Sequence, residues 1–211
     1  MSGIAKTIGL CLGFIVIVLS MFYYSKTRVP QLSDEQLREQ GVFLLPTPRD
    51  IEPFSLELAD GSFSNESLKG KWSFLFFGFT QCPDVCPTTM AEMGKADLAI
   101  RDSGKEAESG FQGVLVSVDP DRDDAAQVQA YAQAFSPRFV GTVGSRESLV
   151  ALTQQVNVAF AKMPAGEGDF TVDHTGNIVL INPYGHYHGF MKLPHDAETI
   201  RLTYQSLAAR L

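Results

Sequence analysis

The N-terminal segment is an apolar run between basic residues. Residues 8–24 read IGLCLGFIVIVLSMFYY, with no charged side chain between Lys6 and Lys26. A membrane-spanning helix needs about 17–25 such residues. We therefore predict an uncleaved membrane anchor over residues 1–25. A cleavable signal peptide is the alternative, although the end of the run, SMFYYSKTRVP, offers no cleavage site flanked by small residues.

The next stretch, residues 26–50, is polar and contains Pro30, Pro46 and Pro48. Prolines mark turns and loops, so we predict a tether there, with at most one short helix. The apolar run starts at residue 8 and leaves no room for an Arg-rich organelle presequence. We therefore expect a single-pass protein of the bacterial inner membrane.

Residues 51–211 alternate short apolar runs with segments of helical composition, which predicts one globular domain. FSLEL and SFSNESL flank an Asp-Gly turn and predict a hairpin. Two nearly continuous apolar runs predict strands buried on both faces. The fold class is therefore α/β, a sheet of mixed direction with helices on both faces. The predicted elements are strands over 72–80, 111–119 and 139–143, helices over 87–101, 123–135, 145–155 and 197–211, and a hairpin within 170–183.

Two cysteines follow the predicted strand 72–80, in the sequence Gln81-CPDVCP. Each of them, Cys82 and Cys86, precedes a proline, which disfavours the α conformation. We therefore predict a loop rather than a helical turn. A helix N-terminus beneath this loop would favour thiolates. Two converging thiolates either close a disulfide or bind a soft metal ion.

A third ligand has to come from elsewhere, because two cysteines are too few for a closed zinc site. His174 ends a late β run, where the chain can return beside the strand that precedes the cysteines; a polar turn residue is the alternative. Two thiolates and one imidazole suit Cu(I). Cu(II) would take a further, weaker ligand, for which Asp84 is a candidate, with a role in the loop turn as its alternative.

The other histidines and the methionines are weaker candidates. His186 and His188 lie in a glycine-bounded turn and are expected to be solvated, and His195 is expected at the surface. Four methionines form no Met-x-Met pattern and are expected to pack in the core or at its rim: Met90, Met93, Met163 and Met191.

Composition and charge exclude several classes. Hydrophobic residues make up 45% and charged residues 19%, which excludes a disordered chain. The net charge is −7, and the first 29 residues hold three basic and no acidic side chains, so the remainder is still more acidic. A nucleic-acid-binding protein needs a basic face, so we expect no nucleic-acid partner.

Four segments of the domain resemble the Sco (SenC) family of copper-binding assembly proteins for cytochrome c oxidase. The resemblance covers nearly all of residues 51–211. It implies a thioredoxin-like domain that binds one copper ion, as Cu(I) or Cu(II), through Cys82, Cys86 and His174. Asp119 and Arg122 match the family's VDPxRD segment and are expected to be structural. The segments are FFGFTQCPDVCP (76–87), SVDPDRD (117–123), YAQAFSPRFVGTVG (131–144) and DFTVDHTGNIVLINPYG (169–185).

The resemblance further implies a membrane-anchored copper chaperone whose domain faces the periplasm. Such a protein would deliver copper to the dinuclear copper site of cytochrome c oxidase subunit II, and would meet a periplasmic copper donor or thiol reductant. A thiol–disulfide oxidoreductase that reduces the acceptor cysteines before metallation is the alternative. A peroxidase of the peroxiredoxin type is disfavoured, because both cysteines share one loop.

Overall fold

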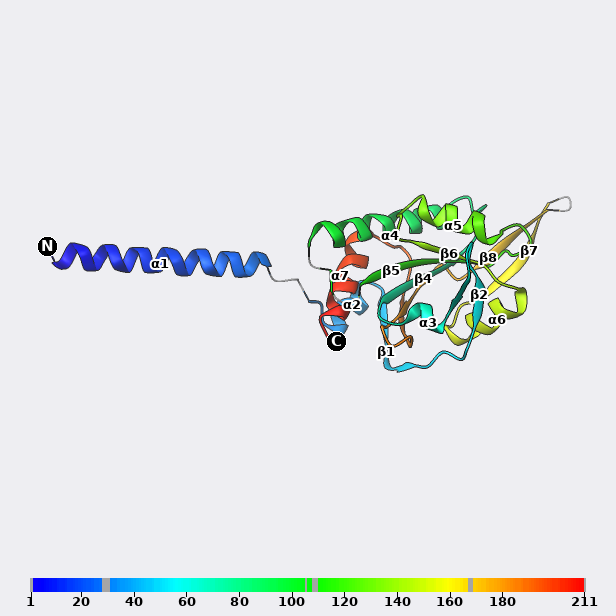
Figure 1. Ribbon diagram of the computed structural model, residues 1–211, viewed down its shortest axis with the longest axis horizontal. Coiled ribbons are helices and arrows are strands. Elements are labelled where there is room, and N and C mark those ends of the chain that lie inside the picture. The colour runs from blue at the N-terminus through cyan, green and yellow to red at the C-terminus, as the bar shows by residue number, and fades with distance from the viewer. Residues whose placement is uncertain (1, 28–30, 105, 108–109, 167–168, 211) are drawn as a thin grey trace. The chain divides into compact units, whose positions relative to one another are not determined.

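A computed structural model describes residues 2–27, 31–104, 106–107, 110–166 and 169–210. Contacts divide the chain into two units, residues 1–30 and 31–211. The first unit is helix α1 (Ser2–Thr27) (Figure 1). Its segment Lys6–Tyr23 has a mean hydropathy of 2.0, and it is long and apolar enough to cross a membrane. A membrane anchor and a signal sequence share these features, so α1 is a candidate span.

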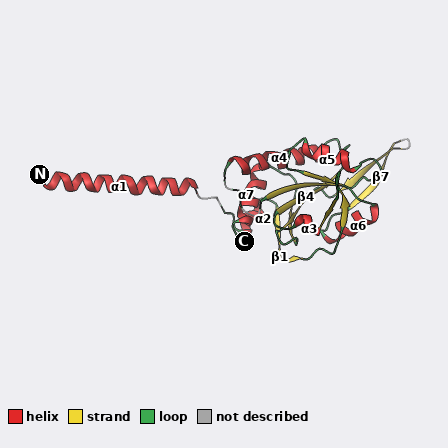
Figure 2. Cartoon of the chain, viewed as in Figure 1, coloured by secondary structure: helices red, strands yellow, loops and turns green. Residues whose placement is uncertain are grey.

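The second unit is built on a mixed sheet, whose strands are yellow in Figure 2. The sheet has six strands in the order β1-β10-β9-β4-β5-β6. The pairs β4–β5 and β5–β6 are parallel, and the other pairs are antiparallel. This confirms the predicted mixed sheet. The strands are β1 (Val42–Arg49), β4 (Trp72–Gly78), β5 (Phe111–Ser117), β6 (Val140–Thr142), β9 (Ile178–Ile181) and β10 (Tyr187–Met191).

Two small antiparallel sheets and six helices complete this unit. The strand pairs are β2 (Ser55–Glu57) with β3 (Ser62–Ser64), as predicted for the Asp-Gly hairpin, and β7 (Phe160–Gly166) with β8 (Asp169–His174). Helices α4 and α5 lie on one side of the sheet, and α3 and α6 on the other (Figure 1). The helices are α2 (Asp34–Glu39), α3 (Asn65–Leu68), α4 (Val85–Asp102), α5 (Ala125–Gln133), α6 (Arg146–Gln155) and α7 (Ala197–Ala208).

Strand β4 is the centre of the core. All seven of its residues are buried, because β5 and β9 pair with its two edges and other elements cover both faces. A strand of this kind needs apolar side chains on both faces, which explains the run WSFLFFG. The loop that leaves β4 therefore starts from a fixed point.

The predicted tether over residues 26–50 does not extend to its predicted end. Residues 31–50 belong to the folded unit, where Leu37 of α2 is fully buried and β1 pairs with β10. Pro46 and Pro48 fit there because β1 is an edge strand, and an edge strand tolerates prolines that cannot donate to a ladder. The folded region thus begins well before residue 51.

The hairpin predicted within residues 170–183 is wrong. Strand β8 pairs with β7, whereas β9 pairs with β4 and β10, so the two β runs lie in different sheets. Strand β7 contains Pro164 and ends at Gly166, which hid it from the sequence pattern. The turn after β8 is instead held to the start of β7, where the Thr175 N–H donates to the Ala159 carbonyl at 2.9 Å.

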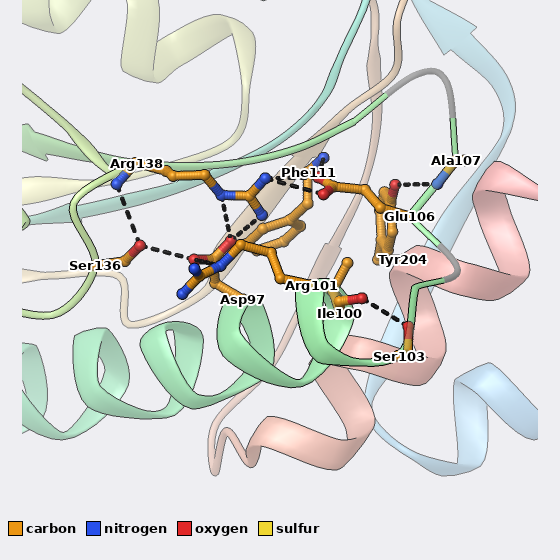
Figure 3. A network of polar contacts seen from close by, with 10 residues as sticks. All are labelled: Asp97, Ile100, Arg101, Ser103, Glu106, Ala107, Phe111, Ser136, Arg138 and Tyr204. Carbon is orange, nitrogen blue, oxygen red and sulfur yellow. Dashed lines mark hydrogen bonds and ion pairs between the residues drawn. The ribbon is translucent and has the colours of Figure 1, made fainter.

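A network of ion pairs and hydrogen bonds surrounds the buried carboxylate of Asp97 (Figure 3). Asp97 of α4 is fully buried and accepts hydrogen bonds from Ser136 Oγ at 2.7 Å and Arg138 Nε at 3.0 Å. Arg101 pairs with the same carboxylate at 3.3 Å. Arg138 also donates to both oxygens of Glu106, at 2.9 and 3.0 Å. The network ties α4 to the loops that precede β5 and β6.

Candidate metal centre

Two sulfur atoms and one ring nitrogen converge at the end of β4. The side-chain donors of Cys82, Cys86 and His174 lie within 4.8 Å of one another. Cys86 Sγ lies 3.5 Å from His174 Nε2, and the Cys86 N–H donates to Cys82 Sγ at 3.4 Å. Within the described ranges, no other group of three or more His, Cys, Asp or Glu side chains converges in this way.

The two cysteines occupy different local structures. Cys82 is half-buried in the loop after β4, where its N–H donates to the Phe79 carbonyl at 3.3 Å. Cys86 is buried in the first turn of α4, which begins at Val85. The prediction that Cys86 lies in a loop is therefore wrong. A proline in the first turn of a helix lacks only an N–H that has no intrahelical partner, so Pro87 does not prevent the helix from starting early.

Gly78 makes room for the Cys86 sulfur, and sequence reasoning missed it. A Cβ at this position would lie 2.9 Å from Cys86 Sγ and 2.9 Å from the Phe76 ring. Any larger residue would push the sulfur away from the end of β4. The signal for it was present in the sequence, since Gly78 interrupts an apolar strand, and a glycine there often marks a close approach.

His174 reaches the cysteines from the last position of β8. Its ring packs edge-on against Phe76 and Phe79, with centroid separations of 5.8 and 6.0 Å. Its Nδ1 lies 3.3 Å from the Thr175 carbonyl oxygen. A proton on Nδ1 would donate to that carbonyl and leave the Nε2 lone pair directed at the sulfurs, an arrangement common among metal-binding histidines.

The two thiols are electrostatically unequal. A hydrogen bond with Cys86, the largest cause, and a smaller one with His174 lower the pKa of Cys82 to about 4 against the opposing effect of burial. The same hydrogen bond with Cys82, together with burial, raises the pKa of Cys86 above its ordinary range. At neutral pH the pair is one thiolate that accepts a hydrogen bond from one thiol.

Comparison with known proteins decides the family. Residues 46–209 match the family model described as SCO1/SenC. The chain belongs to the SCO1/SenC family. Over 159 residues it is 38% identical to the "Putative copper-binding protein" of Stutzerimonas stutzeri, an overlap of 75% of this chain and 76% of the relative.

Two Arabidopsis thaliana comparisons support the same assignment for this Sco protein. It is 34% identical over 150 residues to the mitochondrial SCO1 homolog 1. The overlap spans 70% of this chain but only 44% of the relative, less than half the relative's length. The crystal structure of ScoI with copper bound is 31% identical, with a TM-score of 0.68 over 76% of this chain and 98% of that one. The likeness confirms the thioredoxin-like fold that the sequence resemblance implied.

Cys82 and His174 of this Sco protein line an open cleft of about 250 Å³. Asp84, the candidate for a further ligand, lines this cleft and is exposed, but it does not belong to the converging group. It is the N-cap residue of α4 and makes no side-chain capping hydrogen bond. The cleft gives an incoming molecule access to Cys82 and His174.

Three histidines are less exposed than the sequence suggested. His188, expected to be solvated, is half-buried: it lies on the less buried face of β10, where its ring packs edge-on against Trp72 with a centroid separation of 4.9 Å. His195, expected at the surface, is 9% exposed, with Nε2 2.8 Å from the Gly176 carbonyl oxygen. Burial lowers the pKa of both residues. His186, also expected to be solvated, is likewise half-buried, with a side chain that is 40% exposed and Nε2 3.2 Å from Asp50 Oδ1.

The four methionines singled out in the sequence differ in burial. Met90, Met93 and Met191 are buried in the core, and Met163 on β7 is 47% exposed. The expected core packing is therefore confirmed for these three methionines and wrong for Met163, which lies outside the hydrophobic core.

Proposed function

We propose that this Sco protein is a copper chaperone that binds one copper ion through Cys82, Cys86 and His174. The observation that carries the proposal is the convergence of two sulfurs and one imidazole within 4.8 Å. Thiolate and imidazole are the donors that Cu(I) prefers, and a set of three suits its low coordination number. Copper is bound in the related ScoI structure, which supports the choice of metal.

Copper is the cargo in this proposal. Cys82 already accepts a hydrogen bond as a thiolate, so binding has to displace only the thiol proton of Cys86, which leaves to solvent as the second sulfur joins the metal. Release proceeds by ligand exchange, without a change of oxidation state. An acceptor thiolate enters through the open cleft beside Cys82 and bonds to the metal before a donor sulfur leaves.

The acceptor we propose is the dinuclear copper site of cytochrome c oxidase subunit II. The support is family membership, since the Sco family that includes BsSco is one of cytochrome c oxidase assembly proteins. Helix α1 would anchor the chain as a single pass in a bacterial inner membrane, with the folded unit in the periplasm. Copper donors or thiol reductants of that compartment would then be its other partners.

Copper titration of the reduced protein tests this function. We expect saturation near one equivalent of copper, measured with a competing chelator under anaerobic conditions for Cu(I) and by visible absorption for Cu(II). His174→Ala should weaken Cu(II) binding strongly, whereas His186→Ala, which alters a histidine outside the converging group, should leave it unchanged. Equal Cu(II) affinity in the wild type and His174→Ala would remove His174 from the site.

Thiol–disulfide reduction is a second candidate, favoured by the unequal pKa values of the two cysteines. The Cys82 thiolate would attack an acceptor disulfide, form a mixed disulfide and release one acceptor thiolate. Cys86, on losing its proton, would then attack Cys82 and release the second. Two electrons pass to the acceptor, and a thiol reductant must afterwards reduce the Cys82–Cys86 disulfide.

The two functions are separable by experiment. A reductase should turn over a disulfide substrate such as insulin without metal, and Cys86→Ser should trap the mixed disulfide at Cys82. If metal-free protein shows no turnover above the rate of free dithiol, the reductase function fails and copper transfer stands alone.

A further inference from the structure

We propose that Arg122 is a positioning residue that holds the His174 strand against the cysteine loop. The inference rests on the proposed copper-binding function. It starts from the observation that the site is assembled from two separate sheets: the cysteines follow β4 of the main sheet, and His174 ends β8 of the small β7–β8 sheet. Ligands on separate sheets need a connection that fixes their separation.

Arg122 provides contacts to both sides. Its Nη1 donates to the Phe170 carbonyl at 3.1 Å, and its guanidinium lies 4.1 Å from the centroid of the Phe170 ring, both on β8. The same group lies 5.8 Å from the Phe79 ring, in the loop after β4. Phe79 packs in turn against the His174 ring. One planar cation thus contacts the strand that carries the histidine and an aromatic ring that supports it.

Arg122 is itself held in place by a carboxylate. Its Nε donates to Asp119 at 2.5 Å, and Asp119 is buried directly after β5. The Val118 N–H donates to the Gly78 carbonyl at 2.8 Å, which continues the pairing of β4 and β5 into this segment. The guanidinium therefore projects toward β8 from the rigid end of the central sheet.

The neighbouring Asp123 acts on the cysteine side alone. It is buried and accepts hydrogen bonds from the Thr80 N–H at 3.0 Å, from the Thr80 hydroxyl and from Ser117 Oγ at 2.6 Å. Thr80 is two residues before Cys82. Loss of Arg122 would leave this attachment intact, so the cysteines keep their places while the β8 end gains freedom.

Because Arg122 contacts the histidine strand and Asp123 the cysteine loop, loss of Arg122 should change the affinities for Cu(I) and Cu(II) by different factors. Two sulfurs dominate the binding of Cu(I), whereas Cu(II) depends more on the imidazole. Residues outside the ligand set that orient a metal-binding histidine typically change affinity by about 10–100-fold when mutated. In Arg122→Met we therefore expect Cu(II) affinity to fall by about tenfold or more and its absorption spectrum to shift, while Cu(I) affinity falls by a clearly smaller factor.

The control is Arg138→Met, which removes an arginine paired with a buried carboxylate on a different part of the fold. It should lower the denaturation midpoint yet keep both copper affinities and the Cu(II) spectrum. Arg122→Lys retains a cation but not the planar fork, and should recover part of the Cu(II) affinity. Phe170→Leu, a milder change that keeps the backbone carbonyl, should shift the spectrum in the same direction as Arg122→Met.

The outcomes separate this inference from the function on which it rests. If the wild type binds no copper, the proposed function itself fails. If the wild type binds copper while Arg122→Met shows an unchanged spectrum and affinity, or loses Cu(I) and Cu(II) affinity by the same factor, Arg122 has no positioning role. Should Arg122→Met fail to fold, an unchanged Cu(II) spectrum in both Arg122→Lys and Phe170→Leu overturns the inference.

Discussion

Helix α4 carries two buried ionisable groups, and the difference between them separates structure from function. Asp97, in the second half of the helix, is surrounded by Arg101, Arg138 and Ser136, which together satisfy its carboxylate (Figure 3). Cys86, in the first turn, is equally buried, but its sulfur lies beside the Cys82 sulfur and 3.5 Å from His174 Nε2 rather than beside arginines.

The comparison teaches how each buried group is compensated. A buried charge is tolerated when hydrogen-bond donors and an opposite charge accompany it. The Asp97 carboxylate has both from within the chain. The two sulfurs share one proton instead, and the pKa values of Cys82 and Cys86 move in opposite directions as a result. A soft cation would compensate the second cluster as the arginines compensate the first.

The largest effect on stability is expected at the compensated cluster. Asp97→Ala leaves the cations of Arg101 and Arg138 without their common partner. Breaking a buried pair from one side costs about 3–5 kcal/mol, so urea denaturation should show a loss of about 3 kcal/mol in the free energy of unfolding. The exposed Asp102 on the same helix is the control, and its replacement by Ala should change stability by no more than about 0.5 kcal/mol. Equal stabilities for the two variants would contradict a structural role for the network.

The converse is expected at the open cluster. Cys86→Ser keeps the size of the side chain but removes a soft donor, and Cu(I) affinity should fall by more than the ~10–100-fold that loss of an outer contact costs. Its stability without metal should change little compared with Asp97→Ala. Competition against a Cu(I) chelator measures the first quantity and urea denaturation the second. A Cys86→Ser protein that retains wild-type Cu(I) affinity would show that the sulfur is not a ligand.

Sequence patterns predicted the parts of this comparison that are local. Strands β4 and β5 were evident as apolar runs, and the helix predicted over 145–155 is α6, whose N-cap Ser145 accepts a hydrogen bond from the Ser148 N–H at 3.3 Å. The family resemblance implied that His174 joins the cysteines, whereas its place at the end of a late β run had left a polar turn residue as the alternative. Each of these depends on residues adjacent in sequence or on a topology shared across a family.

The rest could not be predicted, because it depends on pairing between distant segments. Residues 42–49 form strand β1 only because they pair with β10. Residues 160–166 form β7 only because they pair with β8. The early start of α4 reflects tertiary packing around Cys86 rather than the dipeptide preference of Pro87. Likewise, no local pattern indicated that the ring of His195 would be covered by the turn at Gly176.

Gly78 gives a way to disturb the open cluster by size alone. Gly78→Ala would place a methyl group 2.9 Å from Cys86 Sγ, and overpacking of this kind costs about 1–3 kcal/mol. We expect a comparable loss of stability in Gly94→Ala, whose added Cβ would lie 2.5 Å from the Phe135 carbonyl oxygen, also against α4. Only Gly78→Ala should weaken Cu(I) binding. Copper affinities that fall equally in both variants would mean that general strain, not displacement of the sulfur, controls the site.

The smallest effect concerns a buried group that neither cluster uses. His195 Nε2 faces the Gly176 carbonyl, and in the described part of the chain its buried Nδ1 has no hydrogen-bond partner. Burial lowers the pKa of His195 in the folded state below its ordinary value of 6.5. Stability is therefore full above about pH 6.5 and falls as the pH drops from there through the folded-state pKa, because the unfolded chain takes up the proton first.

One proton limits this slope to about 1.4 kcal/mol per pH unit. His195→Asn should remove part of the decline in unfolding free energy between pH 7.5 and 5.5 relative to the wild type, whereas His186→Asn, at a side chain that is 40% exposed, should retain it. His188, whose pKa burial also lowers, contributes the same slope to all three proteins and cancels in the difference. Parallel stability curves for the wild type and His195→Asn would show that His195 gains its proton as readily in the folded state as in the unfolded chain. The buried His195 would then carry no free-energy cost of protonation in the folded state. Its behaviour would resemble that of Asp97, whose partners compensate the cost of burying a charge.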